Sequence, residues 1–137
     1  LPLCCYLMGC GSVESVSAFQ KSDGSFYSPR LAASNVKSIR PSGISFKFHL
    51  GKFMDESVQS MMSPGLDMVL VTCRQKDEEL NDILYSVWDH LKLDGMIVVD
   101  HMRSNPKSFE VFKSFCKVHA REHVFFETRY GNAAVQK

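Results

Sequence analysis

The sequence predicts a single α/β domain in which helices cover both faces of a mostly parallel sheet. Short apolar runs, typical of buried parallel strands, alternate along the chain with segments whose apolar residues recur at helical spacing. This alternation favours right-handed crossovers between neighbouring parallel strands. The length of 137 residues fits one domain with one hydrophobic core, so we expect residues 1–137 to form one domain.

Seven segments have the pattern of strands. The runs at 3–8, 68–71 and 96–99 are continuously apolar, as buried strands are, and the run at 68–71 is expected at the centre of the sheet. Apolar and polar residues alternate at 44–48, which indicates a strand with unlike faces. A short connection between the last two segments predicts an antiparallel hairpin. In chain order the predicted strands are 3–8, 25–27, 44–48, 68–71, 96–99, 124–126 and 133–135.

Two helices have a clear apolar face. In the first, charged residues separate apolar ones at helical spacing, which are Leu80, Ile83, Leu84, Val87, Trp88 and Leu91. The second begins at Pro106 and carries Phe109, Phe112, Phe115 and Cys116 on one side. A turn is expected at 93–95, and shorter helices at 14–21, 29–39 and 54–62.

Composition excludes several classes of protein. Sixteen basic and fifteen acidic residues give a net charge of +1, so charge does not imply a nucleic-acid partner. No apolar run approaches the roughly 20 residues that span a bilayer, and we expect no membrane segment. The five cysteines form no CxxC pair, which favours free thiols in a reducing compartment such as the cytoplasm. Because the chain begins at Leu1 rather than Met, we expect it to belong to a longer protein.

A glycine-containing turn follows the first predicted strand. Ligands of parallel sheets bind at the carboxyl ends of the strands, where this turn stands. Gly9 and Gly11 let the backbone approach a ligand closely, and the helix expected from Glu14 offers free N–H groups to it. A plain strand-to-helix turn uses the same residues. The third glycine of a dinucleotide fingerprint is absent at Glu14.

Five segments, taken in order, resemble the successive motifs of class I S-adenosylmethionine-dependent methyltransferases. The likeness is nearest to the small-molecule O-methyltransferases related to catechol O-methyltransferase, and the last segment is its most specific part. The segments are 6–12, 28–31, 48–53, 66–71 and 91–100. This resemblance implies a Rossmann-like methyltransferase fold whose seven-stranded, mostly parallel sheet has the order 3-2-1-4-5-7-6, with the last strand antiparallel.

The same resemblance implies S-adenosylmethionine (SAM) as the cofactor. The residues that it assigns to the cofactor are Gly9, Cys10, Gly11, Ser12, Phe26, Tyr27, Gly51, Lys52, Phe53, Thr72 and Cys73. The chain departs from the family at four places. The family has an acid where this chain has Leu7, a glycine at Val13, a ribose-binding acid at Phe26 or Tyr27, and often an acid near the adenine at Lys52. Each lost hydrogen bond costs about 0.5 to 1.5 kcal/mol, so we expect weak binding.

Asp100 and His101 are the predicted catalytic residues, because they follow a buried strand at the carboxyl end of the sheet. A histidine there can accept a proton from a substrate hydroxyl. A surface-turn histidine that caps a loop is the alternative. Metal-dependent members of the family have further carboxylates here and at Thr72-Cys73. One carboxylate and one imidazole make a poor magnesium site, so no metal is expected.

Three functions remain open at this point. The first is a SAM-dependent methyltransferase that acts on a hydroxyl or similar nucleophile of a small-molecule or macromolecular acceptor. The second is a noncatalytic methyltransferase-like scaffold that binds a partner. A nicotinamide-dependent oxidoreductase is third, because the third glycine and the ribose-binding acid are missing. Besides the acceptor, the candidate partners are neighbouring domains and a second copy of the chain.

Overall fold

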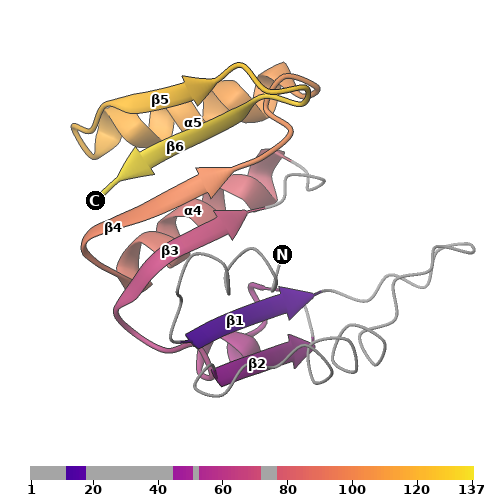
Figure 1. The fold of residues 1–137 in the computed structure, drawn as a ribbon, viewed down its shortest axis with the longest axis vertical. Coiled ribbons are helices and arrows are strands. Elements are labelled where there is room, and N and C mark those ends of the chain that lie inside the picture. Colours follow the sequence, from indigo (N-terminus) through magenta and orange to yellow (C-terminus); the bar gives the residue numbers. More distant parts are fainter. Residues whose placement is uncertain (1–11, 18–44, 51–52, 72–76) are drawn as a thin grey trace, which may run out of the picture. The chain divides into compact units, whose positions relative to one another are not determined.

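The computed structural model describes residues 12–17, 45–50, 53–71 and 77–137 (Figure 1). The chain divides into two compact units, Leu1–Met62 and Ser63–Lys137. Whether residues 1–137 form one domain stays a prediction. Within the described ranges, no helix has both the length and the apolar character needed to cross a membrane.

Among the described residues of the first unit, two parallel strands form a sheet. β1 (Ser12–Ser17) pairs with β2 (Ser45–Leu50) in an uninterrupted register from Ser12↔Ser45 to Ser17↔Leu50. β2 confirms the strand predicted from the alternating pattern at 44–48. The helix expected at 54–62 is present but short, since α3 covers only Glu56–Gln59, with Val58 fully buried.

β1 corrects the prediction of a helix at 14–21. Val13 and Val16 are three residues apart, a spacing that places them on one side of a helix but on opposite faces of a strand. The β-branched valines lose side-chain freedom in a helix, and the three serines compete for its backbone hydrogen bonds. Pairing with β2 then decides for the strand. In the predicted order, the second and third strands are parallel neighbours, as β1 and β2 are. The second strand, however, was expected at 25–27, which lies outside the described residues.

A mixed four-stranded sheet organises the second unit (Figure 1). β3 (Leu66–Val71) is parallel to β4 (Leu91–Val99), and β6 (Asn132–Gln136) lies antiparallel between β4 and β5 (His123–Phe126). The order β3-β4-β6-β5 corresponds to the 4-5-7-6 part of the predicted order. It also confirms the final hairpin.

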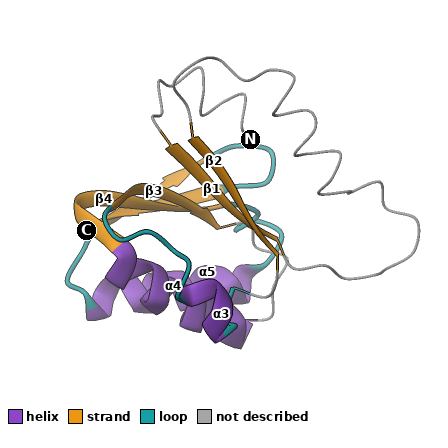
Figure 2. Cartoon of the chain, turned by 90° about the horizontal axis from the view of Figure 1, so that it is seen from below, coloured by secondary structure: helices purple, strands orange, loops and turns teal. Residues whose placement is uncertain are grey.

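Two helices pack together on one face of this sheet (Figure 2). α4 (Asp77–His90) and α5 (Pro106–Val118) confirm the two predicted amphipathic helices. α5 begins with Pro106 after Asn105, whose side chain accepts a hydrogen bond from Ser108 N at 3.4 Å. Their apolar faces and the sheet residues beneath form a buried core that includes Leu80, Leu84, Val87, Phe112, Phe115, Ile97, Val99 and Val135.

The turn predicted at 93–95 is a bulge inside β4. The pairing changes from Leu66↔Leu91 to Met68↔Met96, so four residues of β4 lie opposite one of β3. Asp94 takes a φ of 66°, and a Cβ on Gly95 would lie 2.9 Å from Leu66 O, a spacing that requires glycine. Leu91, expected on the helix, is the first residue of β4, and it is buried all the same.

Candidate functional site

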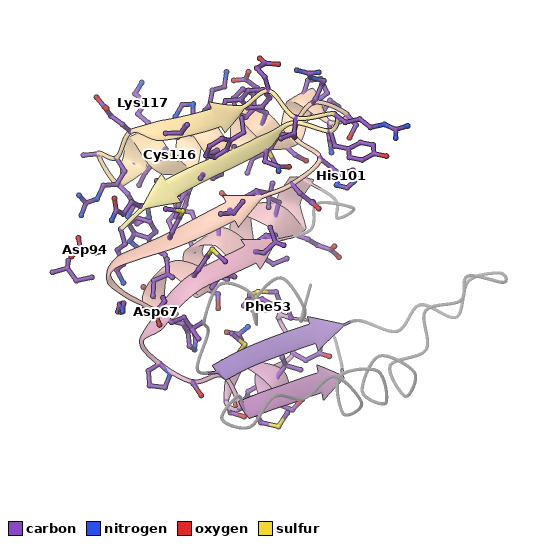
Figure 3. The ribbon with its side chains drawn as sticks, in the orientation of Figure 1. Phe53, Asp67, Asp94, His101, Cys116 and Lys117 are labelled. Atoms are coloured by element: carbon purple, nitrogen blue, oxygen red, sulfur yellow. The ribbon has the colours of Figure 1, made fainter. Side chains whose placement is uncertain are left out.

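The candidate site lies where the parallel strands end, which we call the carboxyl edge. Val71 of β3 and Val99 of β4 finish in register. The next residue, Asp100, donates its backbone N–H to Val71 O at 3.1 Å and is therefore held just beyond both strands. Because β6 runs antiparallel to β4 and β5, the loop that joins β5 to β6 returns to this same edge. His101 is labelled there in Figure 3.

His101 has a backbone conformation that side chains seldom take. Its φ of 59° is in the left-handed region, where a residue other than glycine costs about 1–2 kcal/mol. The turn is closed on its carbonyl oxygen, which accepts hydrogen bonds from Ser104 N at 3.2 Å and from Ser104 Oγ at 2.9 Å. His101 thus stands in a turn that its backbone closes, and both the catalytic role and the alternative of a structural turn histidine stay open.

The imidazole lies against the neighbouring carboxylate. His101 Nδ1 is 3.0 Å from Asp100 Oδ1, and the two side chains are 31% and 21% exposed. Among the described residues Nδ1 has no hydrogen-bond partner, so the contact is a close approach of the ring to the carboxylate and not a formed hydrogen bond. A carboxylate at this distance orients the ring and offsets its charge when the ring takes up a proton.

Tyr130, from the loop between β5 and β6, stacks on His101. The ring centroids are 4.7 Å apart and the ring planes differ by 18°. The guanidinium of Arg129 lies 5.2 Å from the centroid of the same tyrosine ring. Sequence reasoning assigned Tyr130 no role at the site. The topology carries the signal, because an antiparallel last strand brings this hairpin loop beside the end of β4.

Backbone hydrogen bonds tie the two loops of the site together. Met102 N donates to Gly131 O and Arg103 N donates to Tyr130 O, both at 3.0 Å. Arg103 also forms an ion pair with Glu127. Gly131 has a φ of 70°, and a Cβ on it would lie 2.8 Å from Phe125 Cζ and 2.9 Å from Arg103 Cβ. Glycine is therefore required where the loops meet.

The structure describes only two of the residues predicted to hold the cofactor. Ser12 is the first residue of β1 and Phe53 is in the turn before α3. Both belong to the first unit, whereas Asp100 and His101 belong to the second. The other predicted cofactor residues lie outside the described part of the chain. They are Gly9, Cys10, Gly11, Phe26, Tyr27, Gly51, Lys52, Thr72 and Cys73.

The helix whose N-terminus was expected to face the cofactor is replaced by a strand at Glu14, so free N–H groups of a first helical turn are not available there. The roles of the glycines in this turn stay a prediction.

Among the described residues, no group of three or more histidine, cysteine, aspartate or glutamate side chains is placed to hold a metal ion. Thr72 and Cys73 are outside this search, so a metal-free site stays a prediction. Cys116 of α5 is a free, buried thiol, and burial raises its pKa to about 11, against a smaller opposing effect of a backbone hydrogen bond. It is protonated and unreactive at neutral pH.

No protein-family model matches the sequence, and no curated protein does. Solved structures do match it. A precorrin-6y C5,15-methyltransferase from Geobacter metallireducens superposes with a TM-score of 0.66 at 15% identity, over 99% of this chain and 73% of that one. A proposed caffeoyl-CoA O-methyltransferase from Staphylococcus aureus has a TM-score of 0.66 at 12% identity, over 92% and 64%. An O-methyltransferase from Bacillus cereus in complex with SAH has a TM-score of 0.62 at 14% identity, over 92% of this chain and 63% of that one.

This chain spans less than two thirds of the length of the Staphylococcus and Bacillus proteins. The superpositions cover most of the chain with TM-scores above 0.6. The chain therefore has the α/β fold of class I SAM-dependent methyltransferases.

Proposed function

We propose that the protein is a SAM-dependent methyltransferase that acts on a hydroxyl or similar nucleophile. The observation that carries this proposal is the Asp100–His101 contact of 3.0 Å at the carboxyl edge of a methyltransferase-like sheet. This edge is where ligands of such folds bind. The solved Bacillus structure, which contains SAH, supports SAM as the cofactor.

The cofactor is proposed to lie beside the segments named from the sequence, from Gly9 to Ser12 and at Phe26, Tyr27, Gly51, Lys52, Phe53, Thr72 and Cys73. We further propose that the complete sheet has seven strands in the order 3-2-1-4-5-7-6 and that the protein is cytoplasmic. The paired order β3-β4-β6-β5 supports the first of these points.

When bound, SAM supplies a methyl group on a positively charged sulfur, which leaves as a neutral thioether. The part left to the chain is to align the acceptor and to remove its proton. With Nδ1 of His101 toward Asp100, Nε2 is the nitrogen that receives the acceptor's hydroxyl proton. The carboxylate of Asp100 then lies beside the imidazolium and offsets its charge.

Calorimetric titration with SAM and SAH tests the cofactor. We expect binding of both, weakened by the residues at Leu7, Val13 and Phe26 that replace the usual ligands. SAH should also raise the melting temperature, since a ligand that binds only the folded state stabilises it. If neither saturating ligand binds nor shifts the melting temperature, the noncatalytic scaffold becomes the better function, and those three departures from the family are its specific support.

Methyl transfer is tested with isotopically labelled SAM and a panel of hydroxyl acceptors. Activity should persist in a chelator, because the proposed proton acceptor is an imidazole and no step needs a metal. Loss of activity in the chelator, with recovery on adding magnesium, contradicts the metal-free site.

A further inference from the structure

We propose that Tyr130 is a positioning residue that holds the imidazole of His101 in its working orientation. The inference rests on the proposed function for what that orientation serves. Its geometric part does not, because it concerns the ring of His101 alone.

Stacking restricts rotation of the His101 imidazole but leaves the edge of the ring accessible. At a centroid distance of 4.7 Å and an angle of 18°, the tyrosine covers one face of the imidazole. Rotation of the imidazole about its bond to Cβ would break this overlap. The nitrogen atoms lie at the ring edge, so Nδ1 can face Asp100 while Nε2 remains open to an acceptor.

The backbone of Tyr130 is fixed independently of its side chain. Its carbonyl accepts the hydrogen bond from Arg103 N, and the neighbouring Gly131 accepts the one from Met102 N. Tyr130 is 48% exposed, so its ring contributes little to the core. A side chain that is anchored by its backbone, remains exposed and stacks on the proposed base is better explained by orienting that base than by packing.

Charged groups around the stack belong to both loops. Asp100 and Arg103 come from the segment after β4, while Glu127 and Arg129 come from the loop between β5 and β6. Tyr130→Phe keeps the aromatic ring and all four charges, whereas Tyr130→Leu removes only the ring. The two variants therefore separate the contribution of the aromatic ring, which contacts both His101 and Arg129, from that of the hydroxyl.

Proton NMR of the His101 ring tests the orientation without any need for activity, with the signals assigned by their absence in His101→Gln. The ring current of Tyr130 should shift them upfield in the unchanged protein and in Tyr130→Phe. Because Tyr130→Leu loses this ring current in any case, the orientation is measured there by the NOE contacts of the His101 ring protons, which should change from those of one ring orientation to an average over several. Tyr85→Leu is the matched control, because Tyr85 has a similar exposure of 38% and its ring packs on Phe115 and His119 instead. NOE contacts of the His101 ring that are the same in Tyr130→Leu as in the unchanged protein overturn the inference.

Kinetics test what the orientation does. Tyr130→Leu should lower kcat by about 10-fold or more and leave the KM for SAM unchanged, since a small misplacement of a reacting group is costly. Tyr130→Phe should retain activity. In the His101→Ala background, Tyr130→Leu should have no further effect, because it acts through the histidine. Equal losses in both backgrounds, or an inactive Tyr130→Phe, contradict positioning.

If the unchanged protein transfers no methyl group to any acceptor, the proposed function fails and the NMR comparison alone decides the inference. A change in the NOE contacts of the His101 ring in Tyr130→Leu then still supports the positioning of His101 by Tyr130, and unchanged contacts overturn it.

Discussion

The two edges of the four-stranded sheet treat their polar groups in different ways. At the amino edge, where β3 and β4 begin, Lys137 Nζ donates to Trp88 O at 2.6 Å and to Leu91 O at 2.9 Å. Gly65 N donates to His90 O at 2.8 Å, which ties the end of α4 to the start of β3. At the carboxyl edge, His101 Nδ1 approaches Asp100 without a formed hydrogen bond, and His101 itself is in the left-handed region.

Figure 3 shows the separation, with Asp67 and Asp94 at one edge and His101 at the other. Internal pairing at the amino edge is what stability requires, because the carbonyl groups at the end of a helix need donors. Left-handed residues stand at both edges, Asp94 with a φ of 66° at the amino edge and His101 with a φ of 59° at the carboxyl edge. The carboxyl edge differs in that His101 Nδ1 lies 3.0 Å from Asp100 Oδ1 without a formed hydrogen bond. The proposed function would place the chemistry at the carboxyl edge alone.

The largest expected effect is on methyl-transfer turnover, and it compares one histidine at each edge. His101→Ala should lower methyl-transfer turnover by about 100-fold or more, with nearly unchanged SAM affinity, since general-base catalysis contributes about 10²- to 10⁴-fold. His90→Ala is the control at the amino edge, where His90 Nδ1 contacts Ser86 O at 2.9 Å. Its turnover should stay close to that of the unchanged protein. Full activity of His101→Ala would refute the role of base.

Two glycines with positive φ compare the edges sterically. Gly131→Ala adds a Cβ that meets Phe125 and Arg103, whereas Gly65→Ala meets nothing within 4 Å. In both variants the left-handed backbone should lower the free energy of unfolding by about 1–2 kcal/mol, and in Gly131→Ala the clash should lower it by about 1–3 kcal/mol more. Urea unfolding measures both. Equal losses of unfolding free energy would show that the loops at the carboxyl edge are not packed as described.

Cys116 supplies a reference in the core, away from both edges. Its pKa is raised from 9.0 to about 11, so the folded state holds the proton more tightly than the unfolded state. Its contribution to stability is complete below pH 9 and is lost as pH rises through 11. Relative to Cys116→Ala, the unchanged protein should lose about 2 kcal/mol of unfolding free energy between about pH 8 and about pH 10.5. Parallel pH curves for the two proteins would contradict a buried thiol.

The smallest effect belongs to the lysine at the amino edge. Lys137→Met keeps an unbranched apolar chain but removes the ammonium that bonds to two carbonyl oxygens. The free energy of unfolding should fall by about 1–2 kcal/mol, which thermal denaturation can detect. Turnover should not change. A loss of activity larger than the loss of folded protein would mean that the amino edge also serves the chemistry.

The elements that the sequence predicts correctly have long or regular patterns. α4 and α5 repeat their apolar residues over three or more turns, and β2 alternates over its whole length. β1 has only two valines in six residues, and their spacing of three matches a helix better than the period of two of a strand. Its pairing with a strand about 30 residues away decides the outcome. The bulge at Asp94 has the local sequence of a turn, and only the register with β3 distinguishes the two.

The candidate site divides in the same way. Asp100 and His101 follow directly from a recognisable strand, so their position at the carboxyl edge is confirmed. Tyr130 reaches them from another part of the chain, through a contact that depends on the order of three strands. Periodicity describes neighbours in sequence and carries no record of such a contact.

The bulge in β4 makes the sheet tolerant of changes in chain length. Residues 92–95 take up the surplus before Met68 and Met96 come into register, so the distance from there to Val99 is unaffected. Leu93, within this segment, is 74% exposed. A peptide tag or a fluorescent reporter inserted beside Leu93 would therefore be absorbed locally. The carboxyl edge, with Asp100 and His101, would keep its spacing, which makes the bulge the natural place to attach a probe without disturbing the site.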